Sequence, residues 1–187
     1  MFDLYFTLGL QHIADLKGYD HIIFLITLCA AYRLTDWKKL LILVTAFTIG
    51  HTATLALATL RIVHVNAYWI ELLIPVTIFT MGIINLIKPD THSFMKAKYA
   101  TALGFGLIHG LGFSNYLRML LSEEANITMP LLGFNIGVEV GQLLIVVIIM
   151  AISMLILNFT RFKRHDLVIL LSGIGLGTSA IMFIDRI

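Results

Sequence analysis

Long apolar runs separated by short polar clusters repeat along the whole chain. A helix rises about 1.5 Å per residue, so one crossing of the hydrocarbon core takes about 20 apolar residues. The runs therefore predict an all-α, multi-pass membrane bundle of about six transmembrane helices. We expect these helices at residues 19–33, 39–60, 67–88, 98–121, 127–158 and 165–184.

The first of these runs is short for a crossing, and the segment before it is only partly apolar. We expect residues 4–16 to form a helical lead-in that either lies at the membrane interface or enters the bilayer halfway. The turn-forming Lys17-Gly18 step would separate this lead-in from the first span.

Composition supports the membrane assignment. Of the 187 residues, 59% are hydrophobic and 13% are charged, whereas a soluble domain has about 25% charged residues. The single Cys29 excludes an intrachain disulfide and any CxxC zinc motif. The net charge is only +2 and the basic residues are scattered, so a nucleic-acid partner is not expected. Residues 1–187 are predicted to form one transmembrane domain whose surroundings are the lipid bilayer.

Lysine and arginine are unevenly divided between the predicted loops, and such a bias sets the orientation of membrane proteins with short loops. Four basic residues flank the second, fourth and terminal connections, namely Lys17, Arg61, Arg118 and Arg186. Nine flank the other side, namely Arg33, Lys38, Lys39, Lys88, Lys96, Lys98, Arg161, Lys163 and Arg164. Both termini are therefore expected outside the cytoplasm, together with the acidic loop around Glu123 and Glu124.

Glycines recur at intervals of four residues within the predicted spans. Small residues at this spacing let helix backbones approach closely in lipid. Such pairs and triplets are Gly106 with Gly110, Gly133 with Gly137 and Gly141, and Gly173 with Gly177. The Gly173-x-Gly175-x-Gly177 run lies inside an apolar helix, so we interpret it as a packing feature and not as a phosphate-binding loop.

The densest polar motif is His12-x5-Gly18-x-Asp20-His21, at the entry to the first span. Imidazole and carboxylate groups together suit nickel, iron, zinc or manganese. Asp20 and His21 could both bind one ion, or one could support the other as a ligand. The alternative is a hydrogen-bonded helix start in which Asp20 acts near the N-cap.

Two further histidines lie within predicted spans. Thr45, Thr48 and His51 share one helical face, which should point into the bundle. A buried His51 hydrogen-bonded to threonines would be an ordinary structural explanation. His109 is flanked by glycines that leave room for a ligand or another helix, although it too could be a packed core histidine.

The fifth predicted span carries Asn135, Glu139 and Gln142 along one face. A buried Glu139 would be a neutral structural residue, a proton carrier or a metal ligand, because an unpaired charge at membrane depth is costly. Glu71 is expected near the headgroups, where it is either solvated or supports a ligand through a hydrogen bond.

The predicted chain direction brings the histidines and Glu139 to a similar depth, in the outer half of the bundle. We therefore predict a site for a divalent transition metal, with nickel or zinc as the leading ions. Its candidate ligands are His12, Asp20, His21, His51, His109 and Glu139. The candidates for hydrogen bonds to these ligands are Thr48, Glu71, Asn135 and Gln142.

These residues resemble the motifs of the HupE/UreJ family of membrane proteins, which are associated with hydrogenase and urease maturation. The similar elements are His12-x5-Gly18-x-Asp20-His21, Phe47-Thr48-Ile49-Gly50-His51, His109-Gly110-Leu111-Gly112-Phe113 and the block from Phe134 to Gln142, which resemble the second branch of the family. The resemblance implies nickel uptake across a bacterial inner membrane. It departs from the permease branch, whose second element is the denser FHGxAHGxE, because here only His109-Gly110 is local and Glu139 comes from the next helix.

Three functions remain open on the sequence. The first is a nickel-like permease or metal-handling accessory protein, which is not an enzyme. The second is an intramembrane zinc-dependent hydrolase that acts on a lipid or another hydrophobic substrate, with Glu139 or Asp20 as general base. The third is a structural subunit whose buried polar groups only hold helices together. Homo-oligomerisation is left open in each case.

Overall fold

The computed structural model describes residues 2–87, 95–121 and 127–187. Within these residues there are helices and no strand, so the all-α prediction is confirmed. Lys88, Glu123 and Glu124, which entered the orientation argument, lie outside the described residues. In chain order the elements are α1 (Phe2–Ala14), α2 (Asp20–Ala30), the 3-10 helix η1 (Leu34–Asp36), α3 (Trp37–Thr59), α4 (Ala67–Ile87), α5 (Met95–Leu120), α6 (Thr128–Phe159) and α7 (Arg164–Ile184).

The predicted number of about six spans is not confirmed by length and composition. Four described segments are long and apolar enough to cross a membrane, namely Leu34–Thr59, Ala67–Ile87, Thr128–Phe159 and Arg164–Ile184. Helix α5 has 26 residues but a more polar composition, because it includes basic residues at both ends. Helix α2 has 11 residues, which span only about 16 Å.

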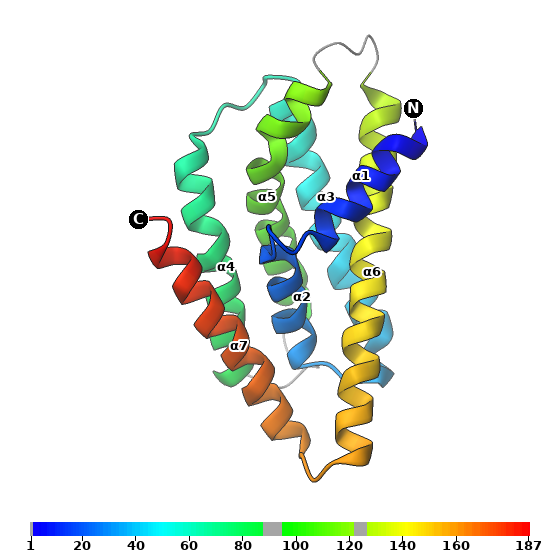
Figure 1. The fold of residues 1–187 in the computed structure, drawn as a ribbon, viewed down its shortest axis with the longest axis vertical. Coiled ribbons are helices and arrows are strands. Elements are labelled where there is room, and N and C mark those ends of the chain that lie inside the picture. Colours follow the sequence, from blue (N-terminus) through cyan, green and yellow to red (C-terminus); the bar gives the residue numbers. More distant parts are fainter. Residues whose placement is uncertain (1, 88–94, 122–126) are drawn as a thin grey trace.

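The predicted lead-in and the first predicted span are two separate helices in the structure, divided near the Lys17-Gly18 step as predicted. Figure 1 shows α1 running from the N-terminus to the middle of the molecule, where α2 begins and continues downward, ending above the lower ends of α6 and α7. Residues 15–19 between them are not helical. Helix α1 packs along α6 and buries Tyr5, Gly9 and Ile13 there. The segment expected as a lead-in is therefore a short helix within the bundle, and α1 with α2 forms one broken path.

Glycines set the close approach of α3 and α5. A Cβ atom built on Gly50 would overlap the carbonyl oxygen of Leu103, and one on Gly106 would overlap the carbonyl oxygen of Phe47. Only a residue without a side chain lets the two backbones meet at these points. The glycine spacing in the fourth predicted span therefore marks a real helix contact.

Helices α1 and α6 meet in the same way. A Cβ atom on Gly9 would overlap the carbonyl oxygen of Phe134, and one on Gly137 would overlap the carbonyl oxygen of Phe6. The N-terminal half-helix is thus pressed against the longest helix of the bundle, α6. This contact carries His12, near the end of α1, toward the interior.

The glycines of α7 differ from the prediction. Gly173 and Gly177 have open space around the position of a Cβ atom, so they make no close helix contact. Gly175, which lies between them, packs against the side chain of Thr27 on α2. The packing interpretation holds for this run, but the contact falls on its middle glycine, because spacing alone does not tell which face of α7 meets a neighbour.

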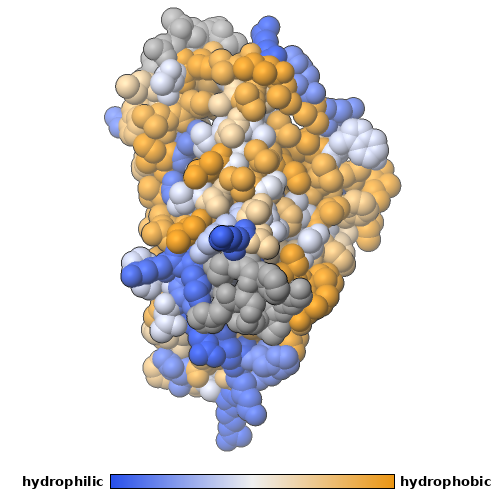
Figure 2. Space-filling view, turned by 180° about the vertical axis from the view of Figure 1, so that it is seen from behind, coloured by the Kyte–Doolittle hydropathy of each residue, from blue (hydrophilic) through white to orange (hydrophobic). Residues whose placement is uncertain are grey.

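The outer surface of the bundle is apolar. Figure 2 shows hydrophobic residues over most of one face, with hydrophilic residues gathered toward its lower end. Exposed apolar side chains occur on α3, α4, α6 and α7, as at Ile49, Phe79, Val147 and Ile181. A large exposed apolar surface is stable only against another apolar phase. These features are those of a membrane protein.

Candidate metal centre

The break between α1 and α2 brings two histidines together. His12 lies in the last turn of α1, and His21 lies in the first turn of α2. The C-terminal end of a helix has unpaired carbonyl groups and a partial negative charge, which favours a cation. The exposed Lys17-Gly18 step lies in the non-helical segment between the two half-helices.

Three imidazoles from three helices converge at this break, and we call His12, His21 and His51 the histidine cluster. One nitrogen from each of them lies within 4.8 Å of the others. The ring centroids are 4.7 Å apart for His12 and His21, 5.9 Å for His12 and His51, and 6.0 Å for His21 and His51. His21 is 4% exposed and His51 is completely buried. The structure therefore brings these three predicted ligands to one point.

The nitrogens of the histidine cluster lack hydrogen-bond partners within the protein. This holds for His12 Nε2 and for both ring nitrogens of His21 and of His51, all of which are buried. A buried polar atom without a partner costs about 1–3 kcal/mol. Several such atoms at one point are costly for stability alone, and they fit a group that binds there.

Asp20 makes a hydrogen bond at the start of α2 and also lies beside the histidine cluster. Its Oδ1 atom accepts a hydrogen bond of 2.8 Å from the backbone N–H of His21 at the start of α2. The same oxygen lies 3.0 Å from His21 Nδ1, without hydrogen-bond geometry to that nitrogen. Asp20 therefore stabilises the helix start and also places a negative charge beside the histidine cluster.

His109 on α5 lies next to the cluster. Its ring centroid is 5.1 Å from that of His21, and the residue is 1% exposed. His109 Nε2 is 3.0 Å from the hydroxyl of Thr77 on α4, whereas Nδ1 is buried without a partner. Thr77 did not enter the sequence analysis. The only feature of the sequence that could have indicated Thr77 is that it is the sole hydroxyl residue in the apolar run Leu72–Phe79.

Aromatic side chains surround the imidazoles. The ring of Phe113 lies 3.9 Å from that of His12, and the ring of Phe47 lies 5.1 Å from that of His109. Phe24 and Phe134 complete this shell, with ring centroids 5.5 Å from His109 and 5.6 Å from His12, respectively. These rings exclude water, which strengthens any interaction between the imidazoles and an ion. The hydrophobic pattern of the sequence does not distinguish these four phenylalanines from other apolar residues of the helices.

A second polar group, which is partly buried, joins α3 to α6, and we call Thr45, Thr48, Glu139 and Gln142 the α3–α6 polar row. Thr45 donates a hydrogen bond of 2.7 Å to Glu139 Oε1, and Thr48 donates one of 2.9 Å to Gln142 Oε1. The side-chain nitrogen of Gln142 has no partner. Glu139 is thus placed against Thr45 and is not one of the three residues whose ligand atoms converge.

The remaining candidates lie around these groups. Asn135 is buried and donates a hydrogen bond of 2.8 Å to the carbonyl oxygen of Leu131, while its own side-chain oxygen has no partner. The Glu71 side chain is exposed on α4. Its backbone carbonyl accepts a hydrogen bond of 2.6 Å from Arg186, because Pro75 cannot supply the usual helical N–H at that position.

The donor set suits a borderline transition metal. Neutral imidazole nitrogens favour zinc, copper, iron and nickel over magnesium and calcium, which prefer oxygen. The three converging histidines supply such nitrogens, and Asp20 supplies a carboxylate that could balance part of the charge of the ion. The arrangement can therefore hold a divalent metal while leaving coordination positions for water or a further ligand.

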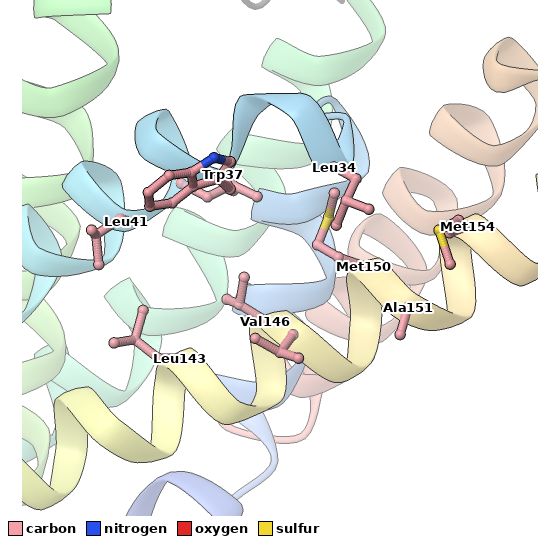
Figure 3. Close-up of a pocket in the computed structure, with 10 residues that line it drawn as sticks. Leu34, Trp37, Leu41, Leu143, Val146, Met150, Ala151 and Met154 are labelled. Atoms are coloured by element: carbon pink, nitrogen blue, oxygen red, sulfur yellow. The ribbon is translucent and has the colours of Figure 1, made fainter.

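An apolar groove lies lower on the bundle, between η1, α3 and α6. It has a volume of about 300 Å³, and Figure 3 shows Trp37 and Leu41 facing Leu143, Val146 and Met150 across it. All ten residues that line it are apolar. The groove therefore offers contact with hydrocarbon and supplies no imidazole or carboxylate ligand.

Comparison with known proteins addresses the identity of the chain. A family model described as HupE / UreJ protein matches residues 1–186. Comparisons with curated proteins and with solved structures gave no match. The apolar helices and the histidine cluster fit a membrane protein that handles metal ions. Because the match covers the described bundle and every candidate ligand, the chain belongs to the HupE/UreJ family.

Proposed function

We propose that this protein is a permease for a divalent transition metal of the nickel type. The observation that carries the proposal is the convergence of His12, His21 and His51 with five buried ring nitrogens that make no hydrogen bond, one of which lies 3.0 Å from Asp20 Oδ1. A protein that needed these residues only for packing would gain stability by pairing or replacing them. A metal ion would use the lone pairs that the fold leaves free.

The ligand roles follow from position. His12, His21 and His51 would bind the ion directly, and Asp20 would support His21 from 3.0 Å away and contribute negative charge. Glu139 would act after the first binding step, since its carboxylate is held by Thr45 on the neighbouring part of α3. Nickel and zinc both accept imidazole ligands, so the uptake measurement has to include both.

The broken α1–α2 path supports transport over simple storage. Transporters commonly bind their substrate where a membrane helix is interrupted, because the free helix ends contribute polar groups at membrane depth. Here the interruption between α1 and α2 (Figure 1) is flanked by two members of the histidine cluster, His12 at the end of α1 and His21 at the start of α2. With both termini outside the cytoplasm, as the loop charges predict, the ion would enter from the side of α1 and leave toward the lower end.

A zinc-dependent hydrolase is the second candidate, and one observation favours it. Three histidines with an open coordination position are also the ligand pattern of catalytic zinc. In this case Asp20 would be the general base, because it is the carboxylate nearest the cluster. The apolar groove of Figure 3 contains none of the histidines among its lining residues, so it does not join a hydrophobic substrate to the cluster.

Metal analysis and uptake separate these functions. Purified protein should bind one or two equivalents of Ni²⁺ or Co²⁺ reversibly, and proteoliposomes should accumulate the ion. A His165→Ala variant is the matched control, because His165 is exposed at the start of α7. Tightly held zinc without uptake would favour the hydrolase. Protein that binds no transition metal would contradict both proposals.

A further inference from the structure

The hydrogen bond between Thr77 and His109 has a defined direction. The Thr77 hydroxyl has a single hydrogen, and its oxygen lies 2.6 Å from the carbonyl oxygen of Ile74. A carbonyl can only accept, so this short contact uses the hydroxyl hydrogen. The Thr77 oxygen, 3.0 Å from His109 Nε2, must then accept a hydrogen bond from Nε2–H.

This direction determines the tautomer of His109. A neutral imidazole carries one N–H, so a proton on Nε2 leaves a lone pair on Nδ1. His109 Nδ1 is buried and has no hydrogen-bond partner. Thr77 and His109 are 3% and 1% exposed, so water does not compete for the bond. The His109 ring also lies 5.1 Å from that of His21.

We propose that Thr77 is a positioning residue that fixes His109 as an Nδ1 donor, so that His109 can join the metal as a fourth imidazole when the ion binds to the histidine cluster. In the structure the His109 nitrogens are not among those that lie within 4.8 Å of one another. The inference rests on the proposed function for the identity of the ligand, but the tautomer itself concerns the metal-free protein. The arrangement follows the general pattern in which the second nitrogen of a ligating histidine donates to a fixed acceptor. A fourth nitrogen donor would favour metals that accept several imidazoles.

Helix α4 supplies a matched control for this hydrogen bond. Thr80 donates to the carbonyl of Val76 at 2.7 Å, in the same way that Thr77 donates to Ile74, but Thr80 is exposed and has no contact with a histidine ring. Thr77→Val keeps the shape of the side chain and removes the acceptor. Thr77→Ser keeps the acceptor. Thr80→Val removes a comparable hydroxyl elsewhere on the same helix.

The test begins with the protein in nanodiscs without metal, labelled with ¹⁵N in its histidine rings. Nitrogen NMR distinguishes a protonated ring nitrogen from an unprotonated one, and a His109→Asn variant assigns the signals. We expect Nε2–H in the native protein and in Thr77→Ser, and a mixture of tautomers in Thr77→Val. An Nδ1–H tautomer in the native protein, or no change in Thr77→Val, would overturn the proposal.

Cobalt binding then tests whether His109 is a ligand. The visible absorption of Co²⁺ reports its coordination, and titration gives its affinity. Thr77→Val should weaken binding by about 10- to 100-fold and change the spectrum, whereas Thr77→Ser and Thr80→Val should match the native protein. Unchanged affinity in Thr77→Val would overturn the ligand assignment. If the native protein bound no Co²⁺, the proposed function would fail, while the nitrogen spectrum would still decide the tautomer.

Discussion

The histidine cluster and the α3–α6 polar row adjoin each other on helix α3, yet they differ in whether their polar atoms make hydrogen bonds. In the row, Thr45 and Thr48 donate hydrogen bonds to Glu139 and Gln142 across the interface. In the cluster, one turn further along α3, both nitrogens of His51 are buried without a partner. The row is partly buried and most of its polar groups are paired, apart from the Gln142 nitrogen, whereas the ring nitrogens of the cluster make no hydrogen bond.

This difference in hydrogen bonding distinguishes polar residues that hold helices together from polar residues that bind a ligand. Interhelical hydrogen bonds such as those of the row hold membrane helices together at modest energy and need no further explanation. Unpaired buried nitrogens oppose folding unless something else uses them. A buried polar residue thus indicates a binding site only when its hydrogen-bonding capacity is left over, and four predictions test this distinction.

The largest effect is expected from removing one imidazole of the histidine cluster. His21→Ala should weaken Ni²⁺ binding by at least about 100-fold, because loss of a direct ligand exceeds the 10- to 100-fold effect of supporting residues. Because His21 is a buried ring that packs against Phe47, the variant leaves a cavity, so its melting temperature is measured to confirm that it folds. Calorimetric titration measures the affinity, with His165→Ala as control. If His21→Ala bound Ni²⁺ as tightly as the native protein, the histidine cluster would not be the metal site, and its difference from the polar row would have no functional meaning.

Asp20→Asn should have the next largest effect. The amide keeps an oxygen that can accept from the His21 backbone, but it removes the negative charge beside His21 Nδ1. We expect a loss of about 10- to 100-fold in metal affinity. Asp15→Asn is the control, because Asp15 is exposed and accepts a hydrogen bond only from the nearby backbone of Lys17. Equal behaviour of the two variants would argue against a role for the Asp20 charge.

Gly106→Ala tests whether the cluster depends on the close approach of α3 and α5. The new Cβ atom would overlap the carbonyl oxygen of Phe47, and overpacking of this kind costs about 1–3 kcal/mol. The melting temperature should fall, and metal affinity should fall with it as His51 and His109 move apart. Gly104→Ala is the control on the same helix, because no atom lies within 4 Å of its Cβ position. A melting temperature as high as that of Gly104→Ala would contradict the packing argument.

The smallest effect is expected in the polar row. Glu139→Gln retains an oxygen that can accept from Thr45, so the α3–α6 contact should persist. Metal affinity should change by less than about threefold, which corresponds to well under 1.4 kcal/mol. The same titration measures this, and the rate of uptake should be compared in parallel. A loss of affinity as large as that of His21→Ala would place Glu139 among the direct ligands.

Most helices could be predicted because their signal is local. Apolar runs gave α3, α4, α6 and α7 to within a few residues, since burial in lipid demands a minimum length of apolar chain. The break at residues 15–19 was indicated only by the weak Lys17-Gly18 signal. The structure shows two helices on either side of this step, as predicted, and the glycines of α6 that the sequence marked for close packing are the ones that contact α1.

The candidate site could be predicted only in part, for a related reason. His12, His21 and His51 stood out because imidazoles are rare and costly in apolar helices, and these three do converge. Glu139 stood out equally, yet the structure sets it against Thr45. Thr77 carried almost no signal, because a threonine in a helix commonly bonds its own backbone.

The sequence by itself determined that this chain enters a membrane as helices and that it carries histidines and acids there, because hydrophobic length and residue chemistry are properties of single segments. The tertiary structure alone decided which polar atoms meet, which are paired and which are left free. That outcome depends on how far each helix is rotated and how closely its glycines let it approach a neighbour, and both are set by contacts between segments far apart in the chain.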